Sequence, residues 1–129
     1  MAMAYVTSVR NARLDANTAA IGTSGLMRLY DGTRPATGGT ATTLLAQLSL
    51  SATSAPAASG GVRTFNPITT ANAAATGTAT WGRITTSGGT ACEDFSVGTS
   101  GSDLNLTTTS IVATQPVSVS SFVLTEGNP

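Results

Sequence analysis

The feature that most constrains this chain is a series of short segments of alternating apolar and polar residues over residues 26–125. In residues 42–51, for example, the alternation is that of a strand with one buried face. Turn signals such as Asp31-Gly32 stop these segments. About seven or eight short strands at this spacing are typical of a β-sandwich or a jelly roll.

The amino-terminal segment has a different pattern, because residues 5–21 are rich in helix formers and Gly22 stands where a helix would be capped. One face of this helix would hold Val6, Val9, Arg13, Asn17 and Ala20, with Leu14 and Ile21 beside it. A chain of 129 residues suits one domain. The sequence therefore predicts a mainly β single domain over residues 1–129, in which an antiparallel β-sandwich or jelly roll (residues 26–125) follows one amino-terminal α-helix.

The composition restricts the chemistry. Charged residues make up 9% of the chain, all six basic residues are Arg, and there is no Lys or His. Without His or Lys, a Ser, Thr or Cys nucleophile lacks its usual base, and no His can hold a metal. A net charge of zero argues against a nucleic-acid partner, and no apolar run is long enough to span a membrane. We expect no enzyme activity, no catalytic residue, no cofactor and no metal site.

Four residues could carry chemistry, but each has a simpler structural interpretation. Glu93 and Asp94 are neighbours on an expected strand, so they point to opposite faces, and we expect solvated surface groups rather than a catalytic pair. Asp103 could join an oxygen-ligand site for Ca²⁺, although an Asx turn explains it. Trp81 could stack on a sugar ring, but we expect it to pack in the core or at an interface.

The exclusive use of Arg as the basic residue has two explanations. Arg forms geometrically fixed, bidentate pairs and suits protein interfaces better than Lys does. On this interpretation, Arg10 and Arg13 on the expected helix and Arg34 in the loop after the first strand face a partner. A compositional bias, for instance from a GC-rich genome, explains the absence of Lys equally well.

A resemblance to a known family begins at residues 26–36, which read LMRLYDGTRPA, and continues with TTLLA at residues 42–46. Residues 76–84 (TGTATWGRI) and 97–106 (VGTSGSDLNL) extend it. These segments resemble a family of small virion structural proteins of tailed bacteriophages. The similarity covers residues 26–129, and the expected helix departs most from it.

The resemblance implies a β-rich capsid decoration (cement) protein that binds the outer head shell, where many copies bind with avidity. The implied partners are the major capsid protein and further copies of the chain, as a dimer or trimer. The implied location is the head surface of the virion, after synthesis in the host cytoplasm. Two alternatives stay open. One is another virion part, such as a tail-tube, collar or fibre-associated β-domain. The other is a carbohydrate-binding adhesion module, which would need an exposed aromatic platform.

Overall fold

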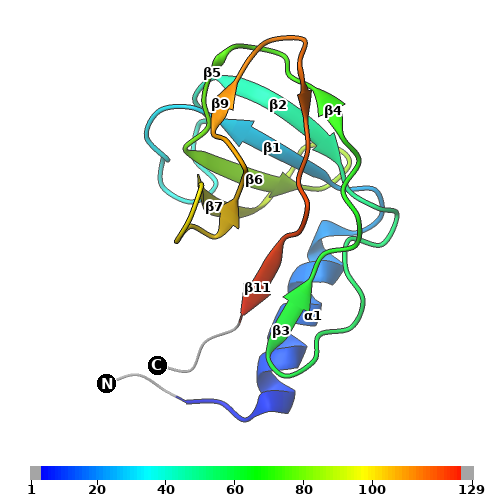
Figure 1. Cartoon of the computed structure of the whole chain (residues 1–129). Coiled ribbons are helices and arrows are strands. Elements are labelled where there is room, and N and C mark those ends of the chain that lie inside the picture. Colours follow the sequence, from blue (N-terminus) through cyan, green and yellow to red (C-terminus); the bar gives the residue numbers. More distant parts are fainter. Residues whose placement is uncertain (1–3, 126–129) are drawn as a thin grey trace.

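The protein, seen as a computed structural model that describes residues 4–125, is mainly β with one amino-terminal helix (Figure 1). Helix α1 spans Thr7–Ile21. The strands are β1 (Leu26–Tyr30), β2 (Leu44–Ser49), β3 (Val62–Thr64), β4 (Ala71–Asn72), β5 (Gly77–Thr78), β6 (Trp81–Thr85), β7 (Ala91–Gly98), β8 (Leu104–Asn105), β9 (Ser110–Ile111), β10 (Pro116–Val117) and β11 (Val123–Thr125). The predicted fold class is confirmed, because the arrangement is consistent with a β-sandwich preceded by a helix.

The largest sheet has the strand order β2-β1-β6-β7-β8. All its pairings are antiparallel except the short parallel contact between β7 and β8. Strand β6 lies in the middle and is buried along its whole length, whereas β1 keeps two partly exposed residues, Leu26 and Arg28. Strands β6 and β7 form a hairpin around Gly88-Gly89, which is a turn signal of the kind that separates the alternating segments.

Three two-stranded pairs, β3–β11, β4–β10 and β5–β9, together form one long interrupted antiparallel ribbon. The opposed residues advance in nearly one register, from Val62 opposite Thr125, through Ala71 opposite Val117, to Thr78 opposite Ser110. Between the named strands, the Phe65 N–H donates to the Phe122 carbonyl at 2.9 Å. We call residues 62–78 and 110–125 the ribbon.

The ribbon connects the sheet to the helix (Figure 1). At one end, the Ala74 N–H donates to the Leu45 carbonyl on β2 at 2.7 Å, which extends the edge of the large sheet. At the other end, β3 packs against α1. Between sheet and ribbon, Phe122 lies 4.8 Å, centroid to centroid, from both Phe65 and Phe95. These rings form part of the core between the two layers.

The alternation of residues 42–51 would place Leu45 with Thr43 and Gln47 on the outward face of β2, but Leu45 is fully buried. Leu29 is opposite Ala46 and Tyr30 is opposite Leu44, so Leu45 is the extra residue of a β-bulge. The ribbon then covers this side chain, because Leu45 lies close against Gly77. A strand that is covered on both faces does not show a clean period of two.

The helix begins two residues later than predicted and ends at the predicted glycine. Gly22 takes a φ of +72°, and its N–H donates to the Thr18 carbonyl. The predicted face is wrong, because Leu14 and Ile21 are the buried residues and Val6 is 68% exposed. The helix packs against β3 and β7 through the side that carries Leu14. No helix within residues 4–125 is long and apolar enough to cross a membrane.

Candidate functional site

The ribbon is attached to the rest of the molecule by a buried ion pair. The Arg63 side chain, on β3, is fully buried, and its Nη2 donates to both carboxylate oxygens of Glu93 at 2.7 and 2.9 Å. Glu93 lies on β7 with a side chain that is 16% exposed. These two charge-assisted hydrogen bonds from one nitrogen hold β3 against β7, so the pair helps to set how the ribbon lies on the sheet.

The same guanidinium reaches helix α1. Arg63 Nη1 donates to the Leu14 carbonyl at 3.4 Å and to Thr18 Oγ1 at 3.5 Å. The guanidinium carbon also lies 4.7 Å from the centre of the Phe65 ring, within the range of a cation–π contact. One side chain therefore joins the ribbon, the sheet and the helix.

A second ion pair holds the loop that follows β1. Arg83 on β6 donates through Nε to Asp94 Oδ1 at 2.6 Å and through Nη2 to Oδ2 at 3.0 Å. The Gly38 N–H also donates to Asp94 Oδ2, and the Gly39 carbonyl accepts from Arg83. The Asp94 side chain is only 2% exposed. The pair thus anchors loop residues 31–43 onto the sheet.

The electrostatics of this second pair favour the ionised form of both partners. Burial by itself raises the pKa of the Asp94 carboxyl, but the hydrogen bonds from Arg83 and Gly38 outweigh it, and the pKa lies below its ordinary value. The hydrogen bond to Asp94 raises the pKa of Arg83 in turn. Asp94 therefore acts as a fixed counterion and is poorly suited to exchange protons near neutral pH.

The expectation that Glu93 and Asp94 are solvated surface groups is wrong. Their side chains do point to opposite faces, since Glu93 meets Arg63 while Asp94 meets Arg83. Both faces of β7 are covered at this point, one by the ribbon and α1, the other by the loop that contains Gly38. The two carboxylates are structural links between elements.

Trp81 packs in the core, as predicted. Its ring is 1% exposed and stacks on Tyr30 with 4.4 Å between centroids. The indole Nε1 donates to the Asp31 carbonyl at 3.1 Å and to Thr42 Oγ1 at 3.0 Å. The Trp81 ring therefore presents no open face to a sugar, and within residues 4–125 only Tyr5 among the aromatic residues is partly exposed.

The other candidates for chemistry have structural roles. Asp103 Oδ2 accepts from the Ser96 N–H at 3.0 Å, and Ser96 Oγ accepts from the Asp103 N–H at the same distance, so Asp103 closes a loop. Burial and then the charge of Glu93 raise the pKa of the Cys92 thiol, which disfavours the reactive thiolate. Among the described residues no three His, Cys, Asp or Glu side chains gather as a metal site would require.

The three arginines predicted to face a partner do not share one surface. Arg10 on α1 lies against Gly61, and the Arg13 guanidinium lies 4.8 Å from the centre of the Tyr5 ring. Arg34 is exposed in the loop after β1, at the other end of the molecule from the amino-terminal half of α1 (Figure 1). These positions define two separate candidate contact surfaces, one on α1 and one on the loop after β1.

The ribbon supplies a third surface, which sequence reasoning missed. Arg63 is its single charged residue, and that side chain is fully buried. Its exposed side chains include the hydroxyls of Thr64, Thr70, Thr76, Thr78, Ser118 and Ser120. The sequence does contain a signal for this uncharged surface, because residues 64–82 and 104–125 contain no Asp, Glu, Lys or Arg. Apart from buried Arg63, the ribbon has no formal charge to attract or repel a neighbour.

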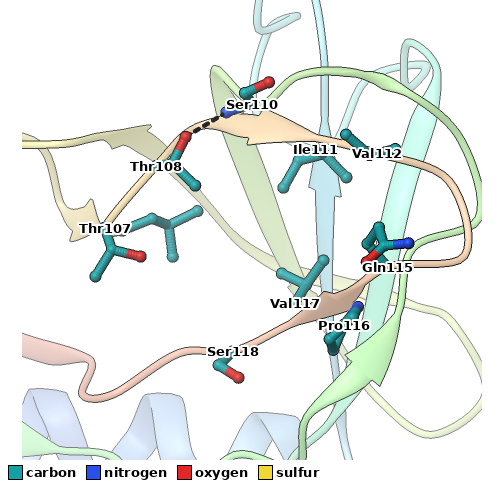
Figure 2. A pocket seen from close by; sticks show the side chains of 10 residues that line it. Thr107, Thr108, Ser110, Ile111, Val112, Gln115, Pro116, Val117 and Ser118 are labelled. Carbon is teal, nitrogen blue, oxygen red and sulfur yellow. Dashed lines mark hydrogen bonds between the residues drawn. The ribbon is translucent and has the colours of Figure 1, made fainter.

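A pocket opens on this uncharged surface (Figure 2). It has a volume of about 250 Å³ and lies between two arms of the chain, residues 106–112 and 115–118. Ile111 and Val117, which are 4% and 7% exposed, form its floor, and Thr108 and Ser118 belong to its hydroxyl-bearing wall. We call it the hairpin pocket.

Comparisons with protein-family models, with curated proteins and with solved structures each found no match.

Proposed function

We propose that this chain is a structural protein of a tailed-phage virion, a decoration protein that binds the outer face of the head shell and bridges neighbouring capsomers. The observation that carries the proposal is the surface of the ribbon, which is long, uncharged and rich in hydroxyl groups. A protein that acts by adding contact area needs an exposed surface with few charges on a rigid scaffold, and it needs no reactive centre.

The internal ion pairs support the same function. Arg63–Glu93 and Arg83–Asp94 use four of the few charged side chains to join α1, the ribbon, the sheet and the loop after β1. A decoration protein must keep its shape while the shell beneath it is under load. Cross-links between elements serve that need directly.

The choice of a phage shell as partner depends on the resemblance of residues 26–36 to small virion proteins. These residues form strand β1 and the start of the following loop, including exposed Arg34. The resemblance therefore covers both a core strand and a surface segment that can reach a partner.

A carbohydrate-binding module is the less favoured function. It needs an exposed aromatic platform, and Trp81 is buried beneath Tyr30 and the loop after β1. The partly exposed Tyr5 already has Arg13 over its ring.

The direct test is cryo-electron microscopy of particles whose genome carries this gene, with mass spectrometry of the same preparation. We expect the chain in many copies on the outside of the head. Density only in the tail, collar or fibres would identify the alternative virion component, and absence of the chain from the particle would reject both.

Charge reversal can identify the surface that faces the shell, because the three arginines predicted to face a partner lie on two separate surfaces. We expect Arg34→Glu, or the pair Arg10→Glu and Arg13→Glu, to lower the number of copies per particle. Arg28→Glu is the matched control, because it makes the same charge change on β1, outside both candidate surfaces, and it should leave the number of copies unchanged. If none of these variants changes occupancy, the arginines make no contribution to shell binding.

A further inference from the structure

The hairpin pocket lies beside an exposed apolar side chain. Val112 is 49% exposed although it is part of the wall of the pocket. It begins a tight turn in which the Gln115 N–H donates to the Val112 carbonyl at 3.0 Å. A projecting side chain and a cavity thus lie next to each other on one surface (Figure 2).

We infer that this surface binds a second copy of the chain about a twofold axis, so that Val112 of each copy enters the hairpin pocket of the other. In a twofold interface the same patch serves both partners, and it must therefore carry both the projection and the cavity. The hairpin meets that condition with Val112 and the floor formed by Ile111 and Val117.

Charge also favours a second copy as the occupant. Residues 104–125 contain no charged side chain, so two copies of this patch meet without like-charge repulsion. A charged partner segment would lose its hydration on entering the pocket and would find no counterion there. The chain itself presents an uncharged apolar projection of the required kind, Val112.

The backbone of the turn is consistent with a constrained contact site. Thr114 has a φ of +69°, a conformation that a β-branched residue rarely adopts. Its N–H donates to the Ala73 carbonyl, which holds the turn against β4. Backbone strain of this kind is found where the surrounding structure fixes a segment for binding. In this turn Thr114 lies between Val112 and Gln115, whose backbone groups are hydrogen-bonded to each other.

The test is sedimentation of the full-length chain in solution, without any shell, from about 1 µM to about 1 mM. We expect a dimer whose dissociation constant rises about 100-fold or more in Val112→Asp, because a carboxylate would be buried in a pocket whose lining holds no counterion. Val6→Asp makes the same chemical change at an exposed valine on another surface and should leave association unchanged.

A complementary pair of variants gives a second measurement. Ser118→Arg places a cation on the wall of the pocket and should weaken self-association in the same way as Val112→Asp. An equimolar mixture of Val112→Asp and Ser118→Arg should form a heterodimer, since one contact becomes an Asp–Arg pair while the other stays native. Circular dichroism of each variant separates loss of association from loss of folding.

A wild-type chain that stays monomeric over this range overturns the inference. So does a trimer, or an assembly that Val112→Asp leaves intact, or a mixture of the two variants that does not associate. Because association is measured without any shell, failure of the interface and failure of the proposed function can be distinguished. A dimer that does not occur in particles would reject the function alone, and a monomer that decorates heads would reject the interface alone.

Discussion

The two ends of the ribbon are held by different interactions. At the β3–β11 end, Arg63 is buried, charged and bonded to Glu93 and to the Leu14 carbonyl of α1. At the opposite end, around the hairpin pocket, no side chain is charged, backbone hydrogen bonds such as that from the Thr114 N–H to the Ala73 carbonyl join the strands, and Thr114 has a positive φ. The first end is fixed by a buried charged side chain that bonds both the sheet and α1, whereas the second has no charged side chain and leaves Val112 exposed.

This difference indicates a division of labour. An ion pair between buried groups fixes geometry but contributes little net stability compared with apolar packing, because both charges lose their hydration. It is therefore suited to setting how the ribbon lies against the sheet and helix. An uncharged surface with an adjacent pocket is suited to repeated contact with other protein chains. We call the β3–β11 end, where Arg63 is bonded, the anchored end, and the end with the hairpin pocket the hairpin end. The anchored end positions the surface that lies at the hairpin end.

We expect the largest change in the free energy of unfolding from a substitution at the anchored end. Glu93→Ala leaves the Arg63 guanidinium buried without a counterion, which should lower the free energy of unfolding by about 3–5 kcal/mol. Urea denaturation at neutral pH measures this change. Arg28→Ala is the matched control, because Arg28 bonds Gln47 at the surface, and it should change stability by about 0.5 kcal/mol or less.

The double variant Arg63→Met with Glu93→Gln sharpens this test, since it removes both charges while keeping side chains of similar length. We expect it to recover most of the stability that Glu93→Ala loses. If Glu93→Ala unfolds no more easily than Arg28→Ala, the ribbon is held by apolar packing at both ends and the comparison fails.

The next effect concerns Asp94, which anchors the loop after β1 rather than the ribbon. Asp94→Asn should lower the free energy of unfolding at pH 7 by about 2–3 kcal/mol, because Arg83 loses its counterion. The pKa of Asp94 is lowered in the folded state, so its ionised form stabilises the fold above an unfolded pKa of about 3.9, and this contribution is lost as the pH falls through the folded value.

The wild type and Asp94→Asn should therefore differ most at neutral pH and converge as the pH falls below about 4. Urea denaturation over this pH range gives the measurement. A difference that stays constant from neutral to acid pH would show that the Asp94 charge is not what holds the loop after β1.

Local patterns were sufficient for the elements whose signals are contiguous in the chain. The turn signal Asp31-Gly32 marked where the first strand ends and Gly22 marked where the helix ends, and β1 (Leu26–Tyr30) and α1 (Thr7–Ile21) do end there. Trp81 was expected in the core or at an interface because it is a large aromatic residue, and it is buried in the core. The helix face was wrong because residues 5–21 have no clear apolar stripe, so tertiary contacts decide which side is buried.

The ion pairs and the ribbon depend on contacts that no local pattern encodes. Arg63 and Glu93 are separated by 30 residues, and the ribbon is interrupted near Pro67 in one strand and by the turn that begins at Val112 in the other. A partial signal did exist for the pair. Period two places Arg63 on the same face as buried Phe65, and a charged residue on an apolar face requires a partner. Only the fold shows that Glu93 is that partner.

At the hairpin end, the expected effect is smaller and has the opposite sign. Thr114→Gly removes the steric cost of a positive φ, which should raise the free energy of unfolding by about 1 kcal/mol. Ala113→Gly, at the neighbouring position in the same turn, is the control and should not stabilise the chain. If Thr114→Gly also lowers the free energy of unfolding, the positive φ of Thr114 is not strained. The two ends of the ribbon would then not differ in backbone strain.

The smallest predicted effect tests whether α1 depends on the anchored end rather than on its own capping. Val6 occupies the N-cap position and makes no side-chain cap hydrogen bond, while the Arg63 guanidinium bonds the helix at Leu14 and Thr18. Val6→Asp places a carboxylate where it can accept from the N–H of Ser8 or Val9, which should raise the free energy of unfolding by about 0.5–1 kcal/mol. Thermal denaturation at neutral pH measures the gain.

In a Glu93→Ala background α1 also loses the ion pair that positions Arg63, so the same Val6→Asp change should recover only a small part of the lost stability. Full recovery would mean that the weak end of the helix, and not the buried ion pair, limits the stability of the anchored end.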